Sequence, residues 1–263
     1  MITDHFLVTD RVAIVTGAGR GIGAATARAL AEAGADVVLS SRTRADLDAV
    51  AADVVAAGRR AVVVESDLND VTTLPPLVDA AMAEFGRLDI VVNNVGGSFP
   101  RALLETSAGM FERAFHFNVT TALELTKAAV PHLVESPGGG TVVNISSLIG
   151  RLSDRGFAAY GTAKAALTHL TRLMAADLAP RVRVNGIAVG STATSALEMV
   201  LTDDSIRDAL EAGTPLRRLG QPLDMALGVL YLCSPAGSFM TGKILEIDGG
   251  LEAPNLSLGL PDL

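Results

Sequence analysis

The sequence has few of the residues that crosslink a protein or bind metals. Cys233 is the single cysteine in 263 residues, so no internal disulfide can form, and we expect a buried, unreactive thiol in a reducing compartment. The four histidines, at positions 5, 116, 132 and 169, lack the spacing of metal ligands, and no metal site is predicted. A chain of this length buries about three-quarters of its unfolded surface, so its core alone can hold the fold.

Long apolar runs and positive charge are also scarce. No stretch approaches the roughly 18 uninterrupted apolar residues of a membrane span, and residues 1–10 lack the basic start and apolar run of a signal peptide. The net charge of −8 argues against a nucleic acid or an anionic membrane as partner. With 49% hydrophobic and 19% charged residues, the composition predicts a soluble globular protein, which we expect in the cytoplasm.

Short apolar runs alternate with longer amphipathic stretches along the whole chain. The predicted strands are Val12–Thr16, Asp36–Ser40, Ala61–Glu65, Ile90–Asn93, Thr141–Ser146, Val182–Ile187 and Ile244–Ile247. The predicted helices are 22–34, 43–57, 72–85, 104–134, 157–179 and 222–233. Continuously apolar strands are typical of a parallel sheet that is covered on both faces.

This alternation predicts one α/β domain over residues 1–263. We expect a doubly wound, Rossmann-like, mostly parallel seven-stranded sheet with helices on both faces, which binds ligands outside the carboxyl ends of its strands. Residues 191–219 are expected to form a substrate lid, and residues 252–263 an irregular C-terminal tail.

Three polar side chains lie around one predicted strand end. Ser147 follows strand 141–146, and Tyr160 and Lys164 lie four residues apart in the next helix, so they share a face. A free phenol has a pKa of about 10, and a neighbouring ammonium lowers it by favouring the phenolate. Tyr160 can then exchange a proton with an alcohol or alkoxide, while Ser147 donates a hydrogen bond to the same oxygen. None of these groups accepts a hydride, so a redox cofactor is required. By itself, the Tyr-x-x-x-Lys spacing is also that of an ordinary pair on a helix surface.

A glycine-rich turn joins the first strand to the first helix. It reads T-G-x-x-x-G-x-G over residues 16–23. Glycines let the backbone approach a pyrophosphate, and the helix N-terminus offers free N–H groups. Such a turn could also be a plain strand-to-helix connection, but its place after the first strand predicts dinucleotide binding.

Together these motifs resemble the short-chain dehydrogenase/reductase family from about residue 8 to residue 252. The glycine loop, Asn93-Asn94-Val95-Gly96, Asn118, Ser147, Tyr160 and Lys164 occur in the family's order and approximate spacing. The resemblance implies that Tyr160 is the acid/base and that Lys164 binds the nicotinamide ribose and lowers the tyrosine pKa. It also implies that Ser147, rather than Ser146, binds the substrate oxygen. Asn118 would hold a water of a proton relay, although alone it could be a helix-interior Asn bonded to backbone.

The resemblance further implies a set of cofactor-binding residues. Asp67 would accept from the adenine amino group, although alone it could be the N-cap of the next helix. Val189-Gly190 replaces the family's Pro-Gly pair, which leaves the loop to Thr192 and Thr194 less restrained. The full set is Gly17, Gly19, Arg20, Gly21, Ile22, Gly23, Ser41, Arg42, Asp67, Leu68, Asn94, Gly96, Tyr160, Lys164, Gly190, Thr192 and Thr194.

The end of the second strand favours NADP(H) over NAD(H). NAD-selective sites place a carboxylate there to bind the ribose 2′-hydroxyl, whereas NADP sites use arginine for the 2′-phosphate. Ser41 occupies the place of that carboxylate, and Arg42 and Arg20 can hold a phosphate.

The predicted activity is the NADP(H)-dependent interconversion of a carbonyl and a secondary alcohol in a small-molecule substrate. Segments Gly97–Leu104, Leu148–Phe157 and Ser195–Thr214 should surround the carbonyl, and their apolar members favour a hydrophobic substrate, although amphipathic packing explains them equally. The resemblance implies a homodimer or homotetramer. The alternative is a catalytically silent nucleotide-binding sensor of the same fold; the presence of both Tyr160 and Lys164 argues against it.

Overall fold

A parallel sheet forms the centre of the computed structural model, which describes residues 1–194, 204–256 and 259–260. Its strands are β1 (Val12–Thr16), β2 (Asp36–Ser41), β3 (Ala61–Glu65), β4 (Ile90–Asn93), β5 (Gly140–Ser147), β6 (Val182–Val189) and β7 (Ile244–Ile247). All neighbouring strands pair in parallel, in the order β3-β2-β1-β4-β5-β6-β7. The predicted doubly wound, seven-stranded parallel sheet is therefore confirmed.

The strand order reverses between β1 and β4. The chain moves outward from β1 to β3, returns to the other side of β1 at β4, and moves outward again to β7. In open α/β sheets a crevice forms outside the carboxyl ends of the strands at such a reversal, and ligands bind there.

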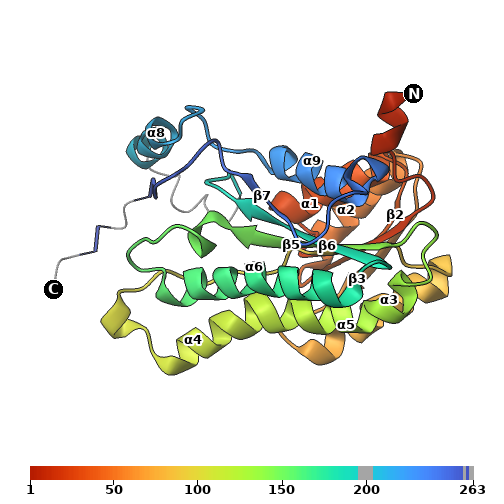
Figure 1. Cartoon of the computed structure of the whole chain (residues 1–263), viewed down its shortest axis with the longest axis horizontal. Helices are drawn as coiled ribbons and strands as arrows, with labels where there is room; N and C mark the ends of the chain where they lie inside the picture. The colour runs from red at the N-terminus through yellow and green to blue at the C-terminus, as the bar shows by residue number, and fades with distance from the viewer. Residues whose placement is uncertain (195–203, 257–258, 261–263) are drawn as a thin grey trace.

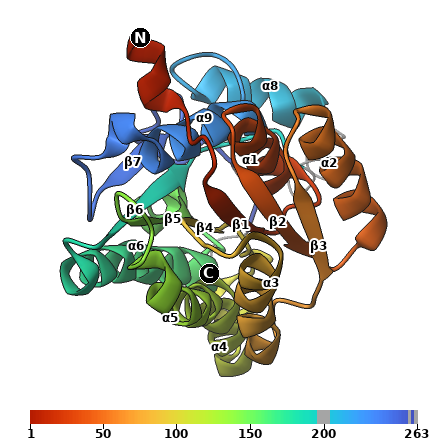
Figure 2. The ribbon, with the colours of Figure 1, turned by 90° about the vertical axis from the view of Figure 1, so that its right-hand side faces the viewer.

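Helices cover both faces of the sheet (Figures 1 and 2). One face carries α1 (Gly21–Glu32), α2 (Arg44–Ala56) and α9 (Pro222–Cys233). The other carries α3 (Pro75–Phe85), α5 (Thr121–Leu133) and α6 (Ala158–Leu178). Helix α8 (Asp204–Gly213) lies beyond the carboxyl ends of the strands (Figure 1). None of the helices in the described parts of the chain is both long and apolar enough to cross a membrane.

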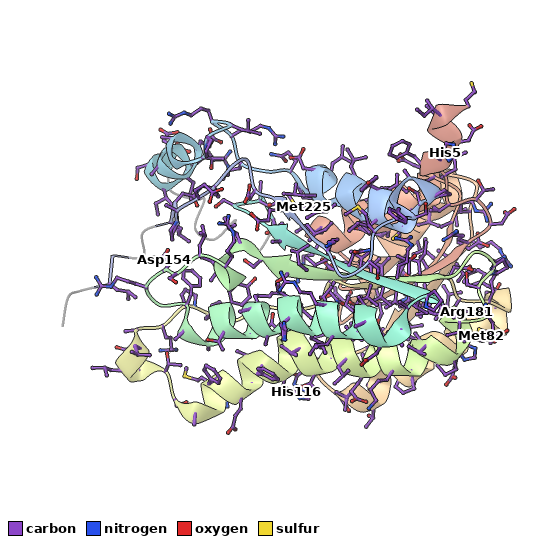
Figure 3. The ribbon with its side chains drawn as sticks, in the orientation of Figure 1. His5, Met82, His116, Asp154, Arg181 and Met225 are labelled. Carbon is purple, nitrogen blue, oxygen red and sulfur yellow. The ribbon has the colours of Figure 1, made fainter. Side chains whose placement is uncertain are left out.

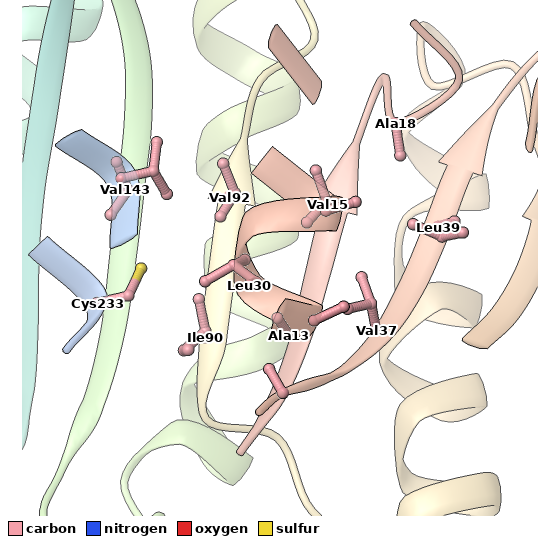
Figure 4. Packing of buried hydrophobic residues seen from close by; sticks show 14 of the residues in the cluster. Ala13, Val15, Ala18, Leu30, Val37, Leu39, Ile90, Val92, Val143 and Cys233 are labelled. Carbon is pink, nitrogen blue, oxygen red and sulfur yellow. The ribbon is translucent and has the colours of Figure 1, made fainter. Parts of the chain in front are cut away.

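The strands are continuously apolar because each supplies both layers of the core. Successive side chains of a strand point to opposite faces, so Ala13 and Val15 pack toward α1 and α9 whereas Ile14 packs toward α3 and α5. Figure 4 shows the first of these clusters, with Leu30 of α1 lying over the strands. This two-sided burial gives the uninterrupted apolar runs that the sequence shows.

One long predicted helix is interrupted in the structure. Residues 104–134 form a 3₁₀ turn (Leu103–Glu105), helix α4 (Ala108–Phe115), a π-helical turn (His116–Thr120) and α5. The prediction of a single helix was wrong here. The buried amide of Asn118, within this turn, donates to the carbonyl oxygens of Ala114 in α4 and of Gly97 in the segment after β4, which accompanies the wider turn.

Candidate active site

The end of β5 brings Ser147 to Tyr160. Ser147 is the last residue of β5, and Tyr160 lies in the first turn of α6, where the two side chains hydrogen-bond. The side chain of Ser146 points to the other face of the sheet, where Oγ donates to the carbonyl oxygen of Lys164 at 3.0 Å. The structure therefore brings Ser147, and not Ser146, to the tyrosine, as predicted.

Lys164 approaches the same point from one helical turn further along α6. Its side chain is buried, with the residue 3% exposed, and Nζ donates to the carbonyl oxygen of Ile145 at 2.8 Å. Nζ lies 5.7 Å from the centre of the Tyr160 ring. Ser147, Tyr160 and Lys164 thus converge at the carboxyl end of β5.

The pKa shifts of this pair differ from the prediction. Burial raises the pKa of the Tyr160 hydroxyl, and its hydrogen bond to Ser147 offsets part of that rise. Burial also lowers the pKa of Lys164 to about 7. The expected lowering of the tyrosine pKa by the lysine is therefore overridden, because loss of solvent disfavours both the phenolate and the ammonium.

Asn118 and Gly96 pack tightly against the lysine. Asn118 Oδ1 accepts from the N–H of Gly97 at 2.9 Å, and Nδ2 donates to Gly97 and Ala114 carbonyls at 3.0 and 2.7 Å. A Cβ at Gly96 would lie 2.8 Å from Lys164 Nζ and closer still to Asn118 Oδ1, so a larger residue here must displace one of these side chains. The Asn118 amide is occupied by backbone, and its role in a water relay stays a prediction.

The glycine loop adopts a conformation that other residues avoid. Gly17 and Gly21 have φ of +63° and +56°, in the left-handed region that favours glycine. Asn94 supports the loop from behind, since Nδ2 donates to the carbonyl oxygens of Thr16 at 2.9 Å and Gly17 at 3.3 Å. Asn94 therefore shapes the loop, and its contact with the cofactor stays a prediction.

Thr16 is a supporting residue that the sequence reasoning missed. Its hydroxyl donates to the carbonyl oxygen of Val92 and accepts from the N–H groups of Asn94 and Val95 at 2.9 and 3.1 Å. The signal was available, because the glycine pattern itself begins with this threonine.

The predicted site for the adenosine ribose lies where β2 ends. Ser41 is the last residue of β2, and its Oγ is buried with no hydrogen-bond partner in the parts of the chain that are described. Arg20 and Arg42 are exposed, and neither side chain forms an ion pair or hydrogen bond with any described residue. Asp46 of α2 also lies here: a Cβ on Gly19 would be 2.9 Å from Asp46 Cβ and 3.0 Å from Ser41 Oγ. Sequence reasoning missed this carboxylate because it lies in the helix rather than at the strand end.

Of the other predicted cofactor contacts, some lie in the core and one is exposed. Ile22 and Leu68 pack into the core on opposite faces of the sheet. Asp67 is exposed and accepts from the N–H of Asn69 at 3.1 Å, while Asp70, not Asp67, caps the following turn. The alternative that Asp67 is an N-cap is therefore wrong.

The loop after β6 lies against the glycine loop. Thr194 lies 3.6 Å from the position of a Cβ on Gly21. Thr192 pairs with Gly220 and donates its hydroxyl to the carbonyl oxygen of Gly190 at 3.1 Å. A Cβ on Gly190 would lie 2.5 Å from the Cα of Asp248, so the loop is packed closely against the segment after β7.

These features fit a dinucleotide. A left-handed glycine turn opens onto the N-terminus of α1, an unpartnered buried hydroxyl lies at the end of β2, and two arginines beside it have no partners among the described residues. Helix N-termini and arginines are the groups that hold phosphates.

A polar network that was not predicted lies beneath the site. Asn93 Nδ2 donates to Asn144 Oδ1 at 2.8 Å, and Asn144 Nδ2 donates to Thr171 Oγ1 at 2.9 Å. All three residues are buried, and they join β4, β5 and α6. The network ties together the elements that position Ser147 and Tyr160.

The substrate side is described only in part. The apolar side chains of Phe99, Leu103 and Leu104 are exposed, Phe99 by 79% and Leu104 by 80%. Of the predicted lid, residues 195–203 lie outside the described residues, while α8 follows them. Figure 3 places Asp154, in the loop after β5, at the same end of the molecule as α8, and Arg181 at the opposite end.

Comparison with known proteins agrees with this geometry. Residues 17–252 match the family described as Enoyl-(Acyl carrier protein) reductase. An uncharacterized oxidoreductase of Mycobacterium tuberculosis (strain CDC 1551 / Oshkosh) is 60% identical over 263 residues, which is the whole of both chains. The 7alpha-hydroxysteroid dehydrogenase of Escherichia coli (strain K12) is 38% identical over 94% of this chain and 96% of its own.

Two solved structures are similar in fold and sequence. A 7alpha-hydroxysteroid dehydrogenase complexed with NADH and 7-oxo glycochenodeoxycholic acid has a TM-score of 0.91 and 36% identity, covering 96% of this chain and 98% of its own. The Pseudomonas aeruginosa RhlG/NADP complex has a TM-score of 0.88 and 33% identity, covering 94% and 98%. The chain belongs to the short-chain dehydrogenase/reductase family and is an oxidoreductase of that family.

Proposed function

We propose that the protein interconverts a carbonyl and a secondary alcohol with NADP(H), using Tyr160 as acid/base. The observation that carries the proposal is the convergence of Tyr160 with Ser147 and Lys164 at the carboxyl end of β5. That point lies at the edge of the sheet where the glycine loop also ends.

Each side chain has a defined part in the reaction. In the direction of reduction, Tyr160 gives its proton to the carbonyl oxygen as negative charge develops there, and its raised pKa keeps the phenol protonated until then. Ser147 donates a hydrogen bond to the same oxygen. Lys164 would hold the nicotinamide ribose hydroxyls, and the reduced nicotinamide, when bound, supplies the hydride. In the direction of oxidation, Tyr160 takes the proton back from the alcohol.

The preference for NADP(H) rests on the residues at the end of β2. Ser41 offers a hydroxyl where a carboxylate would reject the 2′-phosphate, and Arg20 and Arg42 would hold that phosphate. The comparisons leave the choice open, since one similar structure contains NADH and the other NADP.

We propose a hydrophobic alicyclic ketone or alcohol as substrate. The exposed apolar side chains of Phe99, Leu103 and Leu104 lie on the segment expected beside the carbonyl, and the 7alpha-hydroxysteroid dehydrogenases among its relatives are named for a ring alcohol. Exposed Phe111 and Phe115 on α4 support the proposed homodimer or homotetramer, because such side chains are commonly covered by a second copy.

The central test is Tyr160→Phe, with Tyr231→Phe as the matched control. Turnover of a panel of cyclic ketones is followed by the absorbance of the reduced nicotinamide. We expect Tyr160→Phe to lower kcat by about 10² to 10⁴-fold with cofactor affinity retained, and Tyr231→Phe to behave as wild type. Full turnover by Tyr160→Phe would refute the proposal. Tight cofactor binding by wild type without turnover of any substrate would favour the silent sensor instead.

The cofactor preference has a separate test. Arg42→Ala should raise the KM for NADPH by about tenfold and leave the KM for NADH nearly unchanged, because one charge-assisted contact contributes about 1.4 kcal/mol. Arg44→Ala is the control, since Arg44 already pairs with Asp48. Equal effects of Arg42→Ala on both cofactors would contradict the preference.

A further inference from the structure

The segment after β7 crosses the carboxyl end of the sheet and binds three separate parts of the site. We call residues Leu251–Leu256 the C-terminal strap. It forms no helix or strand, so side chains must hold it in place. The two that do so most directly are Asn255, within the strap, and Arg151, which binds it from the loop after β5.

Asn255 joins the strap to two elements at once. Its Oδ1 accepts from Ser191 Oγ at 2.8 Å, in the loop after β6. Its Nδ2 donates to the carbonyl oxygen of Leu210 at 3.1 Å and to Thr214 Oγ1 at 3.0 Å, at the end of α8. One side-chain amide therefore connects the loop that carries Thr192 to α8, which follows the predicted lid.

The packing around Asn255 is close. A Cβ on Gly213 would lie 2.9 Å from Asn255 Cβ, so the last residue of α8 and the strap are in direct contact. Leu256 packs with Leu210, Leu219 and Ala193 in a small apolar cluster. The end of α8, the strap and the loop after β6 thus form one packed unit.

Arg151 binds the other end of the strap. It follows the 3₁₀ turn after Ser147, and its guanidinium pairs with Glu252 at 3.1 Å and with Glu246 of β7 at 2.9 Å. It also donates to the carbonyl oxygen of Leu251 at 3.1 Å. The loop after the catalytic strand is therefore tied to the same strap as α8.

We propose that Asn255 and Arg151 are positioning residues that fix the substrate side of the site. Through the strap they hold α8, the loop Gly190–Thr194 and the loop after Ser147 in one arrangement. The expected effect on KM rests on the proposed function, but the positioning of α8 can be measured by hydrogen exchange without turnover. The groups that react are untouched, so the strap should govern KM more than kcat.

The test compares Asn255→Ala with Asn185→Ala in the full-length protein. Asn185 lies in β6, away from the carboxyl end of the strand. Like Asn255 it uses both ends of its side-chain amide: Oδ1 accepts from the N–H of Lys243, and Nδ2 donates to the carbonyl oxygen of Met240. Amide hydrogen exchange measures the opening of α8, and steady-state kinetics with NADPH and 7-oxo glycochenodeoxycholic acid measure KM and kcat.

We expect Asn255→Ala to speed exchange in α8 by about tenfold and to raise KM by about five- to tenfold, since each lost hydrogen bond is worth roughly a factor of five. The change in kcat should stay within about threefold. Ser191→Ala, which removes one of the three bonds, should give a smaller rise in KM. Asn185→Ala should lower Tm without changing KM or exchange in α8.

Three outcomes would overturn the proposal. These are unchanged exchange in α8 of folded Asn255→Ala, unchanged KM, and an equal rise of KM in Asn185→Ala. Arg151→Gln should raise KM by about threefold, whereas Arg218→Gln, which breaks a comparable surface pair with Asp224, should not. If wild type reduces no ketone, the proposed function fails, while hydrogen exchange in α8 still decides the positioning role of Asn255.

Discussion

The buried lysine should make the stability of the protein rise with pH, whereas an ion-paired lysine, whose pKa is raised, makes stability fall with pH. Lys164 has a pKa of about 7 in the folded chain, lowered by burial from its ordinary value of 10.5. Between these values the unfolded chain binds more protons than the folded chain, so the free energy of unfolding rises with pH. Below pH 7 the lysine is charged in both states, and its burial costs stability.

The magnitude follows from the same pKa values. From pH 7 to pH 9 the unfolded lysine stays protonated, while the folded lysine goes from half-protonated to neutral. Integrating this difference at about 1.4 kcal/mol per pH unit gives a gain of about 2 kcal/mol. The raised pKa of Tyr160 acts in the opposite sense only above pH 10, where the folded chain binds the extra proton, so it does not enter this window.

Urea unfolding of wild type and Lys164→Met at pH 7 and pH 9, at one protein concentration, measures the effect. Subtracting the two proteins cancels every other group that titrates in the window. Wild type should gain about 2 kcal/mol relative to Lys164→Met. Lys127 has a side chain that is 61% exposed in a surface pair, so the difference between wild type and Lys127→Met, which keeps Lys164, should not change with pH. A wild-type-minus-Lys164→Met difference that stays flat across the window would show that the lysine is not desolvated, and would refute the reasoning.

Three further predictions follow from contacts around the site. Gly96→Ala drives a methyl group against Lys164 and should lower kcat/KM by at least about tenfold in steady-state assays; near-normal activity would contradict this packing. Asn144→Ala removes two buried hydrogen bonds, one with Asn93 and one with Thr171, and should cost about 2 kcal/mol in urea unfolding; a loss below about 0.5 kcal/mol would show that the network relaxes. Asp46→Asn removes a negative charge beside Gly19 and should lower the KM for NADPH relative to the KM for NADH by roughly fivefold. An unchanged ratio of these two KM values would show that the carboxylate does not repel the 2′-phosphate.

Much of the fold could be predicted because its signals are local. Apolar runs such as Val12–Thr16 are buried on both faces of the sheet, and this burial appears in the sequence as an uninterrupted apolar segment. Ser147, Tyr160 and Lys164 could be grouped because a strand end and a helical repeat of four residues set their positions. The break at His116–Thr120 could not be predicted, since a π-helical turn has no proline or glycine to mark it.

Features that depend on contacts between distant segments were beyond the sequence. The direction of the Tyr160 pKa depends on how much solvent the surrounding elements remove, and no spacing in the sequence encodes that. Asp46 lies five residues beyond the strand end, and only the folding of α2 over the glycine loop brings it to Gly19. Asn255 lies in a tail with no periodic pattern, so its three hydrogen bonds appear only when β7 carries it across the site.

The residues proposed for catalysis and those proposed to position the substrate are held by different kinds of contact. The residues proposed for catalysis lie at the end of β5 (Ser147) and in α6 (Tyr160 and Lys164), and the buried network of Asn93, Asn144 and Thr171 joins these elements. The proposed substrate side is instead held by polar contacts of Asn255 and Arg151, which lie outside this buried network. We therefore expect changes in the strap to alter which ketone or alcohol is accepted while the proton-transfer machinery stays the same.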